Sequence, residues 1–121
     1  MSDEKRDYSL FIDDILEAIE KVERYITGRT YEDFSGNEMA VDAVIRNFEV
    51  IGEAAKNIPE EIKKKYPDVE WNEMIGFRNV LIHEYSGIEI ESVWDTLRKN
   101  IPELKKHILD MKAAYERTTD T

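Results

Sequence analysis

Apolar side chains recur at three- and four-residue steps through most of this 121-residue chain, and this spacing limits the possible folds more than any other feature. A helix places such residues on one face, whereas a strand needs apolar and polar residues in strict alternation, a pattern that we find nowhere in the sequence. The first apolar series ends near Gly28, and later series occupy 35–58, 71–85 and 89–115. The sequence therefore predicts an all-α, up-and-down bundle of four to five helices.

Local signals set the expected ends of these helices. The segment "SGNE" offers Ser35 as an N-cap with Glu38 three residues later, a capping box that would open the second helix. Pro59 should stop that helix, because the residue before a proline avoids helical geometry. Pro102 lies inside the last series and removes a backbone donor. We therefore expect a kink there, or two helices that meet at Asn100–Ile101.

Composition narrows the possible classes of function. The chain is long enough for one domain, 1–121, with frayed ends at about 1–6 and 116–121. It has no cysteine, which excludes thiolate chemistry and cysteine-ligated metals. Its two histidines lie 24 residues apart and form no metal-binding motif, so we expect no metal site and no cofactor. The N-terminal segment lacks a signal-peptide core, and no apolar run is long enough to span a membrane, so we expect a soluble, cytoplasmic protein.

Charge is unevenly distributed. The chain carries 17 Lys and Arg against 27 Asp and Glu, a net charge of −10, and such a surface repels nucleic acid at long range. The stretch Arg98–Lys112 nevertheless holds five basic and two acidic side chains. This stretch is either an ordinary solvated helix face or the border of a positive groove, and phosphate contacts need only such a local groove.

The segment "FRNVLIHEY", residues 77–85, places several polar side chains in an apolar, helix-like stretch. Asn79 and His83 share one helix face, and Arg78 lies on its flank. Arginine offers planar donors that match a phosphate, and histidine exchanges protons near neutral pH, so the pair suits metal-free phosphodiester chemistry. The spacing also allows a structural alternative, with Arg78 in a salt bridge and His83 at a helix C-terminus.

Two glycines bear on the surroundings of Arg78. Gly52 and Gly76 lie inside expected helices, where glycine costs about 1 kcal/mol of stability relative to alanine. We therefore expect that the absence of a side chain at these positions lets a neighbouring helix approach closely. If the two helices cross closely at these glycines, Glu53 comes near Arg78 and can support it. Other registers of the two helices remain open.

Three blocks of the sequence, taken in order, resemble one known family. The blocks "VIRNFEVIGEAAKNIP", "WNEMIGFRNVLIHEY" and "VWDTLRKNIPELKKHI" are similar to the HepT family of HEPN-domain proteins, the toxin half of HepT/MntA toxin–antitoxin pairs. The resemblance covers about 8–115, and its central motif is arginine, a polar residue, three further residues, histidine, one residue and tyrosine. It implies an all-helical, usually dimeric, metal-independent endoribonuclease.

By that resemblance, Arg78 and His83 are the catalytic pair and Asn79 is the polar residue that supports them. Tyr85 is then the tyrosine to which a partner nucleotidyltransferase of the MntA type adds AMP, which silences the enzyme. Without the resemblance, a structural role is the favoured interpretation of Tyr85, with its ring packed beneath the turn and its hydroxyl bonded to a backbone carbonyl. The expected partners are RNA, the nucleotidyltransferase antitoxin and a second copy of the chain. Apolar residues around Trp94 exceed what one helix stripe needs, which also favours the homodimer.

Two classes of function remain open at this point. The first is a ribonuclease toxin that cleaves RNA through attack by the ribose 2′-hydroxyl and is neutralised by its nucleotidyltransferase partner. The second is a non-catalytic helical binding module that positions a substrate for that partner. A toxicity assay on the chain alone, with and without His83, separates the two.

Overall fold

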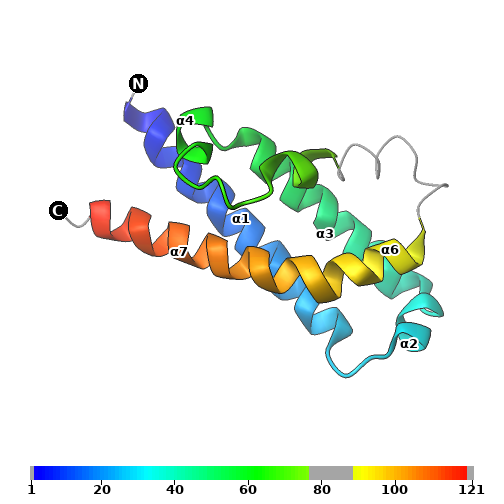
Figure 1. Ribbon diagram of the computed structural model, residues 1–121. Coiled ribbons are helices and arrows are strands. Elements are labelled where there is room, and N and C mark those ends of the chain that lie inside the picture. Colours follow the sequence, from blue (N-terminus) through cyan, green and yellow to red (C-terminus); the bar gives the residue numbers. More distant parts are fainter. Residues whose placement is uncertain (1, 77–88, 120–121) are drawn as a thin grey trace.

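The computed structural model describes residues 2–76 and 89–119, and every regular element in these ranges is helical (Figure 1). The all-α fold predicted from the apolar spacing is confirmed. Residues 71–76 are also helical. The named elements, in chain order, are α1 (Ser2–Ile26), α2 (Tyr31–Ser35), α3 (Glu38–Asn57), α4 (Glu60–Lys63), α6 (Ile90–Asp95), the π-helical turn η2 (Thr96–Asn100) and α7 (Ile101–Thr119).

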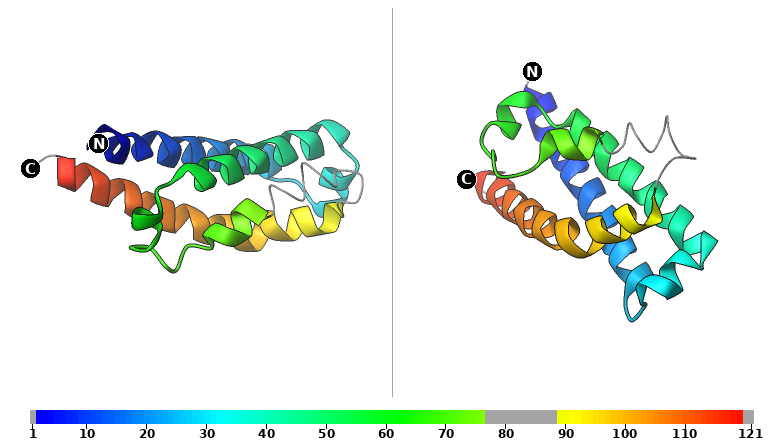
Figure 2. Two further views of the ribbon diagram at one scale, coloured as in Figure 1. Left: turned by 90° about the horizontal axis from the view of Figure 1, so that it is seen from above. Right: turned by 45° about the vertical axis from the view of Figure 1, so that its right-hand side comes forward.

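Three long helices form the body of the bundle. Helices α3 and α7 both run back against α1, and α1 contacts both of them, so the N- and C-terminal ends lie at the same end of the molecule (Figure 2). The stripe predicted for α1 faces inward, with Ile15, Ile19 and Val22 fully buried. On α7 the same is true of Ile108 and Met111. Burial of each such side chain contributes about 1.5–3 kcal/mol of transfer free energy, which stabilises the packing of these three helices.

The ends of α1 and α3 follow the expected rules, with one correction. Gly28 has φ +75, the left-handed conformation that suits a glycine just after a helix. Ile58, before Pro59, is extended with ψ 130 and closes α3. The prediction that Ser35 caps α3 is wrong, because Ser35 is the last residue of α2. The cap is Asn37, whose side-chain oxygen accepts a hydrogen bond of 3.0 Å from the Ala40 amide.

The helix that contains Pro102 changes its winding just before the proline. The Ile101 amide bonds to the Thr96 carbonyl, five residues back, and α-helical winding resumes from Ile101. In a regular helix the Pro102 ring would clash with the Arg98 carbonyl, four residues earlier. Arg98 lies within the π turn, whose wider winding relieves this clash. The disturbance expected at Asn100–Ile101 is therefore a change from π to α winding within one uninterrupted helical run, and not a break between two helices.

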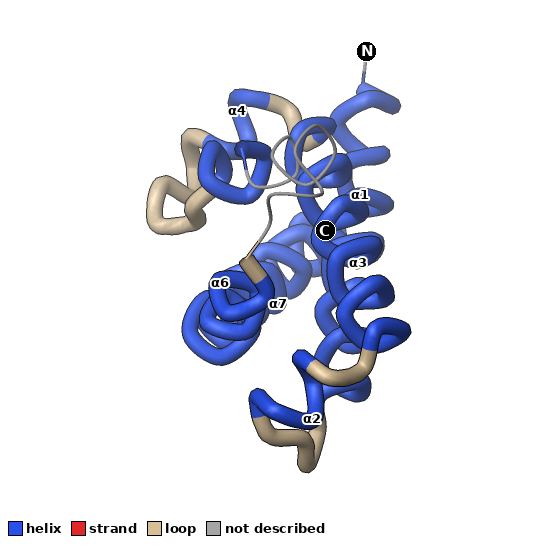
Figure 3. The backbone as a smooth tube through the Cα atoms, turned by 90° about the vertical axis from the view of Figure 1, so that its right-hand side faces the viewer, coloured by secondary structure: helices blue, strands red, loops and turns tan. Residues whose placement is uncertain are grey.

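The short helix α2 covers one end of the bundle (Figure 3). A capping box opens it, in which the side chains of Thr30 and Asp33 each bond to the other's backbone amide. Phe34 is fully buried, and its ring centroid lies 5.2 Å from that of Trp94 on α6, while Tyr31 contacts the same indole edge-on at 6.1 Å. Much of the apolar surface of Trp94 is therefore used within the chain, so Trp94 gives less support to a dimer than its sequence context suggested.

Both ends of the described chain are helical, since α1 begins at Ser2 and α7 ends at Thr119. Within 2–76 and 89–119, none of the helices combines the length and the apolar character that a bilayer crossing requires.

Candidate functional site

The four residues predicted to form the reactive centre fall in one segment. Arg78, Asn79, His83 and Tyr85 lie within 77–88, outside the described residues, so their roles remain predictions. The described chain nevertheless fixes both ends of this segment. The helical residues 71–76 lead into it, and α6 follows it after Glu89.

The helical residues 71–76, which precede this segment in the sequence, are anchored at their start by one aromatic side chain. Trp71 is 7% exposed, and its indole nitrogen donates a hydrogen bond of 3.1 Å to the Tyr66 carbonyl. The backbone reinforces the same turn, since the Trp71 amide donates to the Val69 carbonyl at 2.9 Å. Val69 is itself buried. Buried contacts therefore fix the start of the helical residues 71–76.

Glu53, the predicted support for Arg78, is an exposed residue of α3. It lies in a groove of about 320 Å³ between α1 and α3, together with Asp14 and Arg46. A Cβ added at Gly76 would meet no atom within 4 Å in the described part of the chain, so this glycine does not mark a tight helix crossing there. The pairing of Glu53 with Arg78 stays a prediction.

The basic stretch Arg98–Lys112 divides into two groups in the structure. Lys105 and Lys112 turn toward α1, where their ammonium nitrogens lie 2.8 Å from the Glu23 carboxylate and 3.1 Å from the Asp13 carboxylate. These hydrogen bonds are the main reason that the pKa of each lysine is raised. Part of the local positive excess thus holds α7 against α1.

The remaining basic side chains of this stretch are exposed and begin at the π turn. The Arg98 guanidinium carbon lies 5.8 Å from the centre of the Trp94 ring, a cation–π arrangement that restrains the guanidinium. Lys99 and Lys106 are exposed on η2 and α7. Within the stretch Arg98–Lys112, these three exposed side chains are the ones left to border a phosphate groove.

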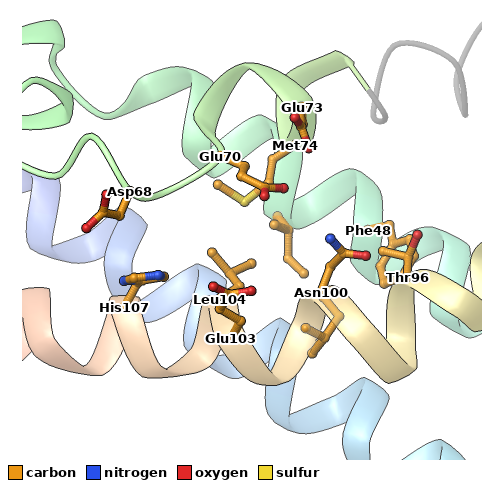
Figure 4. A pocket seen from close by; sticks show the side chains of 12 residues that line it. Phe48, Asp68, Glu70, Glu73, Met74, Thr96, Asn100, Glu103, Leu104 and His107 are labelled. Atoms are coloured by element: carbon orange, nitrogen blue, oxygen red, sulfur yellow. The ribbon is translucent and has the colours of Figure 1, made fainter.

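A separate pocket of about 200 Å³ opens between residues 68–74 and the η2–α7 segment, with α3 at its back (Figure 4). Its apolar surface comes from three elements, since Phe48 belongs to α3, Met74 to the helical residues 71–76 and Leu104 to α7. Ile51 and Ile101 also line it. A cavity of this size between three elements is large enough to hold a small organic group.

Acidic side chains line both walls of this pocket. Asp68, Glu70 and Glu73 belong to one wall, and Glu103 on α7 belongs to the other, where His107 also points into the space (Figure 4). The pKa of Glu70 is raised, first by a hydrogen bond with the Glu73 side chain and then by the charge of Glu73. The charge of Glu103 raises the same pKa and that of His107 lowers it, so the two walls interact electrostatically.

The sequence did not reveal this pocket. Its two walls are about thirty residues apart, and no local pattern indicates that they face each other. Spacing gave a partial signal, because Asn100 at the end of η2 and Leu104 and His107 on α7 follow one another at four- and three-residue steps. Within 2–76 and 89–119, no three His, Cys, Asp or Glu side chains are grouped so that they would hold a metal ion.

Comparison with known proteins identifies the family. Residues 15–111 match the family described as "Ribonuclease HepT-like". The chain belongs to this family. The match extends from α1 to α7, so it includes the helices of the bundle, the pocket walls and the segment that carries Arg78 and His83. The family resemblance seen in the three sequence blocks is confirmed.

Several curated members of the HepT-like family are similar over most of the chain. A probable ribonuclease HepT of Thermococcus cleftensis is 42% identical over 101 residues, which cover 84% of this chain and 92% of the relative. A candidate RNase of Methanocaldococcus jannaschii is 43% identical over 102 residues, 84% of each chain. A larger protein of the same archaeon, named as a γ-glutamylcyclotransferase and candidate RNase, is 40% identical over 105 residues. That match covers 87% of this chain but only 47% of the larger relative, so the chain spans about half of that relative's length. No solved structure matches the chain significantly.

Proposed function

We propose that the protein is a metal-independent endoribonuclease toxin. The observation that carries this proposal is the HepT-like family match over 15–111, together with the arginine–histidine motif at residues 78–83. Relatives that are about 40% identical over most of the chain are named as ribonucleases, which supports the same activity here.

In the proposed reaction, the ribose 2′-hydroxyl attacks the adjacent phosphorus. His83 takes the proton from that hydroxyl, and the 5′-oxygen leaves with a proton from the imidazolium or from water. Arg78 binds the nonbridging oxygens as negative charge grows on them, and Asn79 supports this pair. The bond between phosphorus and the 5′-oxygen breaks, so the products carry a 2′,3′-cyclic phosphate and a 5′-hydroxyl.

The proposed enzyme has two protein partners, a second copy of the chain and an antitoxin. Two copies of the chain form a homodimer in which both sets of Arg78 and His83 border one groove, an isologous arrangement that is the default for identical subunits. Arg98, Lys99 and Lys106 supply exposed positive charge for RNA phosphates beside such a groove. A nucleotidyltransferase antitoxin of the MntA type silences the enzyme by adding AMP to Tyr85, because added phosphate charge repels the RNA backbone.

Controlled expression of the chain alone tests this proposal. Expression of the parent should arrest growth, and total RNA from the arrested cells should be cut. The His83→Ala variant, with unchanged far-ultraviolet circular dichroism, should allow growth and leave RNA intact. Equal growth arrest by the parent and by a folded His83→Ala variant would contradict the catalytic assignment and favour the non-catalytic binding module.

A further inference from the structure

The pocket between 68–74 and α7 combines an apolar interior with a strongly acidic rim. Phe48, Met74 and Leu104 supply apolar surface from three elements. An apolar cavity of about 150 Å³ holds benzene, so the observed volume of about 200 Å³ accommodates one ring with a short chain. The interior therefore suits a compact apolar group better than a phosphate or a nucleotide base with its sugar.

Among the described residues that line the pocket, the ionisable side chains are all acidic, apart from one imidazole. Four carboxylates, those of Asp68, Glu70, Glu73 and Glu103, line the pocket from its two walls. No Lys or Arg side chain is among the described residues that line it. Negative charge on both walls favours a cation between them and excludes RNA phosphate, so this pocket is not a continuation of the proposed RNA groove.

The Glu70 side chain interacts with that of Glu73 on the same wall of the pocket. This interaction is the first cause of the raised pKa of Glu70, so a negative charge on Glu70 is already unfavourable at this position. Each further negative charge nearby, including that of Glu103, makes the deprotonated pair less favourable. A bound cation with its own N–H donors would relieve this repulsion.

We propose that this pocket is a binding site for a small organic cation, a primary ammonium group on a short apolar body that contains one ring. The ring occupies the space between Phe48, Met74 and Leu104. The ammonium group lies at the rim and donates hydrogen bonds to the Glu70 and Glu103 carboxylates on the two walls. This site is independent of RNA cleavage, and its test needs no ribonuclease activity.

Three probes of nearly equal size test the chemical class of the ligand. In titrations followed by ¹H–¹⁵N NMR, 2-phenylethylammonium should bind with a dissociation constant on the order of 0.1–1 mM, as expected for a ligand of this size. The neutral 2-phenylethanol should bind at least tenfold more weakly, and 3-phenylpropionate should not bind. Added salt should weaken only the cation. Amide shifts should centre on Glu70, Met74 and Leu104.

Matched variants test the place of the ligand. Glu103 and Glu32 are both exposed, but Glu103 lines the pocket while Glu32 belongs to α2 at one end of the bundle. Glu103→Gln should weaken 2-phenylethylammonium severalfold, and Glu103→Lys should abolish its binding. Glu32→Gln changes the net charge by the same amount as Glu103→Gln and should leave the affinity unchanged.

Several results would overturn the proposal. Equal affinity for the ammonium and the alcohol, or equal losses in Glu103→Gln and Glu32→Gln, would show that the rim does not select a cation. Shifts centred away from the pocket would place the site elsewhere. A blocked Leu-Arg-Leu peptide that binds more than tenfold tighter than 2-phenylethylammonium would identify the occupant as a side chain of a partner protein rather than a small molecule.

Discussion

The ammonium nitrogen of Lys105 on α7 lies 2.8 Å from the Glu23 carboxylate on α1, a contact between residues 82 positions apart in the sequence. Both side chains are partly buried, with relative exposures of 31% and 38%. Lys112 and Asp13 repeat the arrangement at 3.1 Å further along the same two helices. These two pairs fix the register of α7 against α1, and they use lysines that the sequence alone would assign equally well to an RNA surface.

A double-mutant cycle on Lys105→Met and Glu23→Gln should give a coupling free energy of about 0.2–1 kcal/mol in urea unfolding, because the pair is only partly shielded from water. The hydrogen bond to Glu23 raises the pKa of Lys105, so the lysine stays charged to higher pH in the folded state. The stabilisation should therefore persist below pH 10 and disappear as the pH rises through that raised pKa. Lys106→Met, at an exposed neighbour, should change stability by less than about 0.5 kcal/mol. Zero coupling would show that the register depends on apolar contacts alone.

Adjacent residues of α7 allow a direct test of the core. Ile108 is fully buried and Leu109 is 46% exposed. Ile108→Ala should lower the free energy of unfolding by about 2–5 kcal/mol, through lost transfer free energy and a new cavity. Leu109→Ala should lower it by less than about 0.5 kcal/mol. Urea denaturation monitored by tryptophan fluorescence measures both losses. Similar losses at the two positions would show that the inward face of α7 is assigned incorrectly.

Repulsion between Glu70 and Glu73 should appear in titrations. The pKa of the Glu70 carboxyl should lie above 4.5, as NMR of the side-chain carbon can measure, and Glu73→Gln should lower it by more than Glu103→Gln does. A raised pKa means that the folded protein holds this proton more tightly than the unfolded chain. Stability should therefore fall as the pH rises from about 4.5 through the raised pKa of Glu70, and Glu73→Gln should flatten that slope. A Glu70 pKa that is unchanged in Glu73→Gln would contradict the contact.

The sequence predicted those parts of the fold that depend on local rules. Ile15 and Ile19 are buried because helical periodicity alone determines which face of α1 is apolar. Pro102 disturbs its helix because a proline lacks a backbone donor in any context. Helix α2 was not predicted. It is five residues long, and it depends on a capping box and on contact with Trp94, which belongs to a distant part of the chain.

Prediction of sites was limited by the same physics. The assignment of Arg78 and His83 needs only a motif and a family, and both can be read from the chain without coordinates. The proposed cation pocket forms only where the segment that contains Glu70 faces the segment that contains Glu103, and tertiary packing alone brings the two segments together. Lys105 makes the same point in reverse, since its ion pair with α1 removed it from the candidate RNA surface.

The chemistry of RNA cleavage should be visible in the ends of the products. A purified enzyme should release 2′,3′-cyclic phosphate and 5′-hydroxyl ends, with the same rate in the presence of EDTA. Arg78→Lys should lower the rate at least tenfold, because a point charge cannot reproduce the two parallel hydrogen bonds of a guanidinium. Arg24→Lys, at an exposed position of α1, should leave the rate unchanged. End labelling with polynucleotide kinase identifies the products, and 5′-phosphate ends or a strict need for magnesium would exclude attack by the 2′-hydroxyl.

Tyr85 provides the test of regulation. Tyr85→Phe removes only the hydroxyl that would accept AMP, so the variant should fold normally and retain the ribonuclease activity of the parent. After co-expression with a cognate nucleotidyltransferase, mass spectrometry should find the parent heavier by one or more AMP groups on Tyr85 and inactive on RNA. Added phosphate charge close to the predicted groove accounts for that loss, since it repels the RNA backbone. The phenylalanine variant should stay unmodified and active under the same conditions. If the partner silences it as readily as the parent, inhibition must act through direct binding or through another residue.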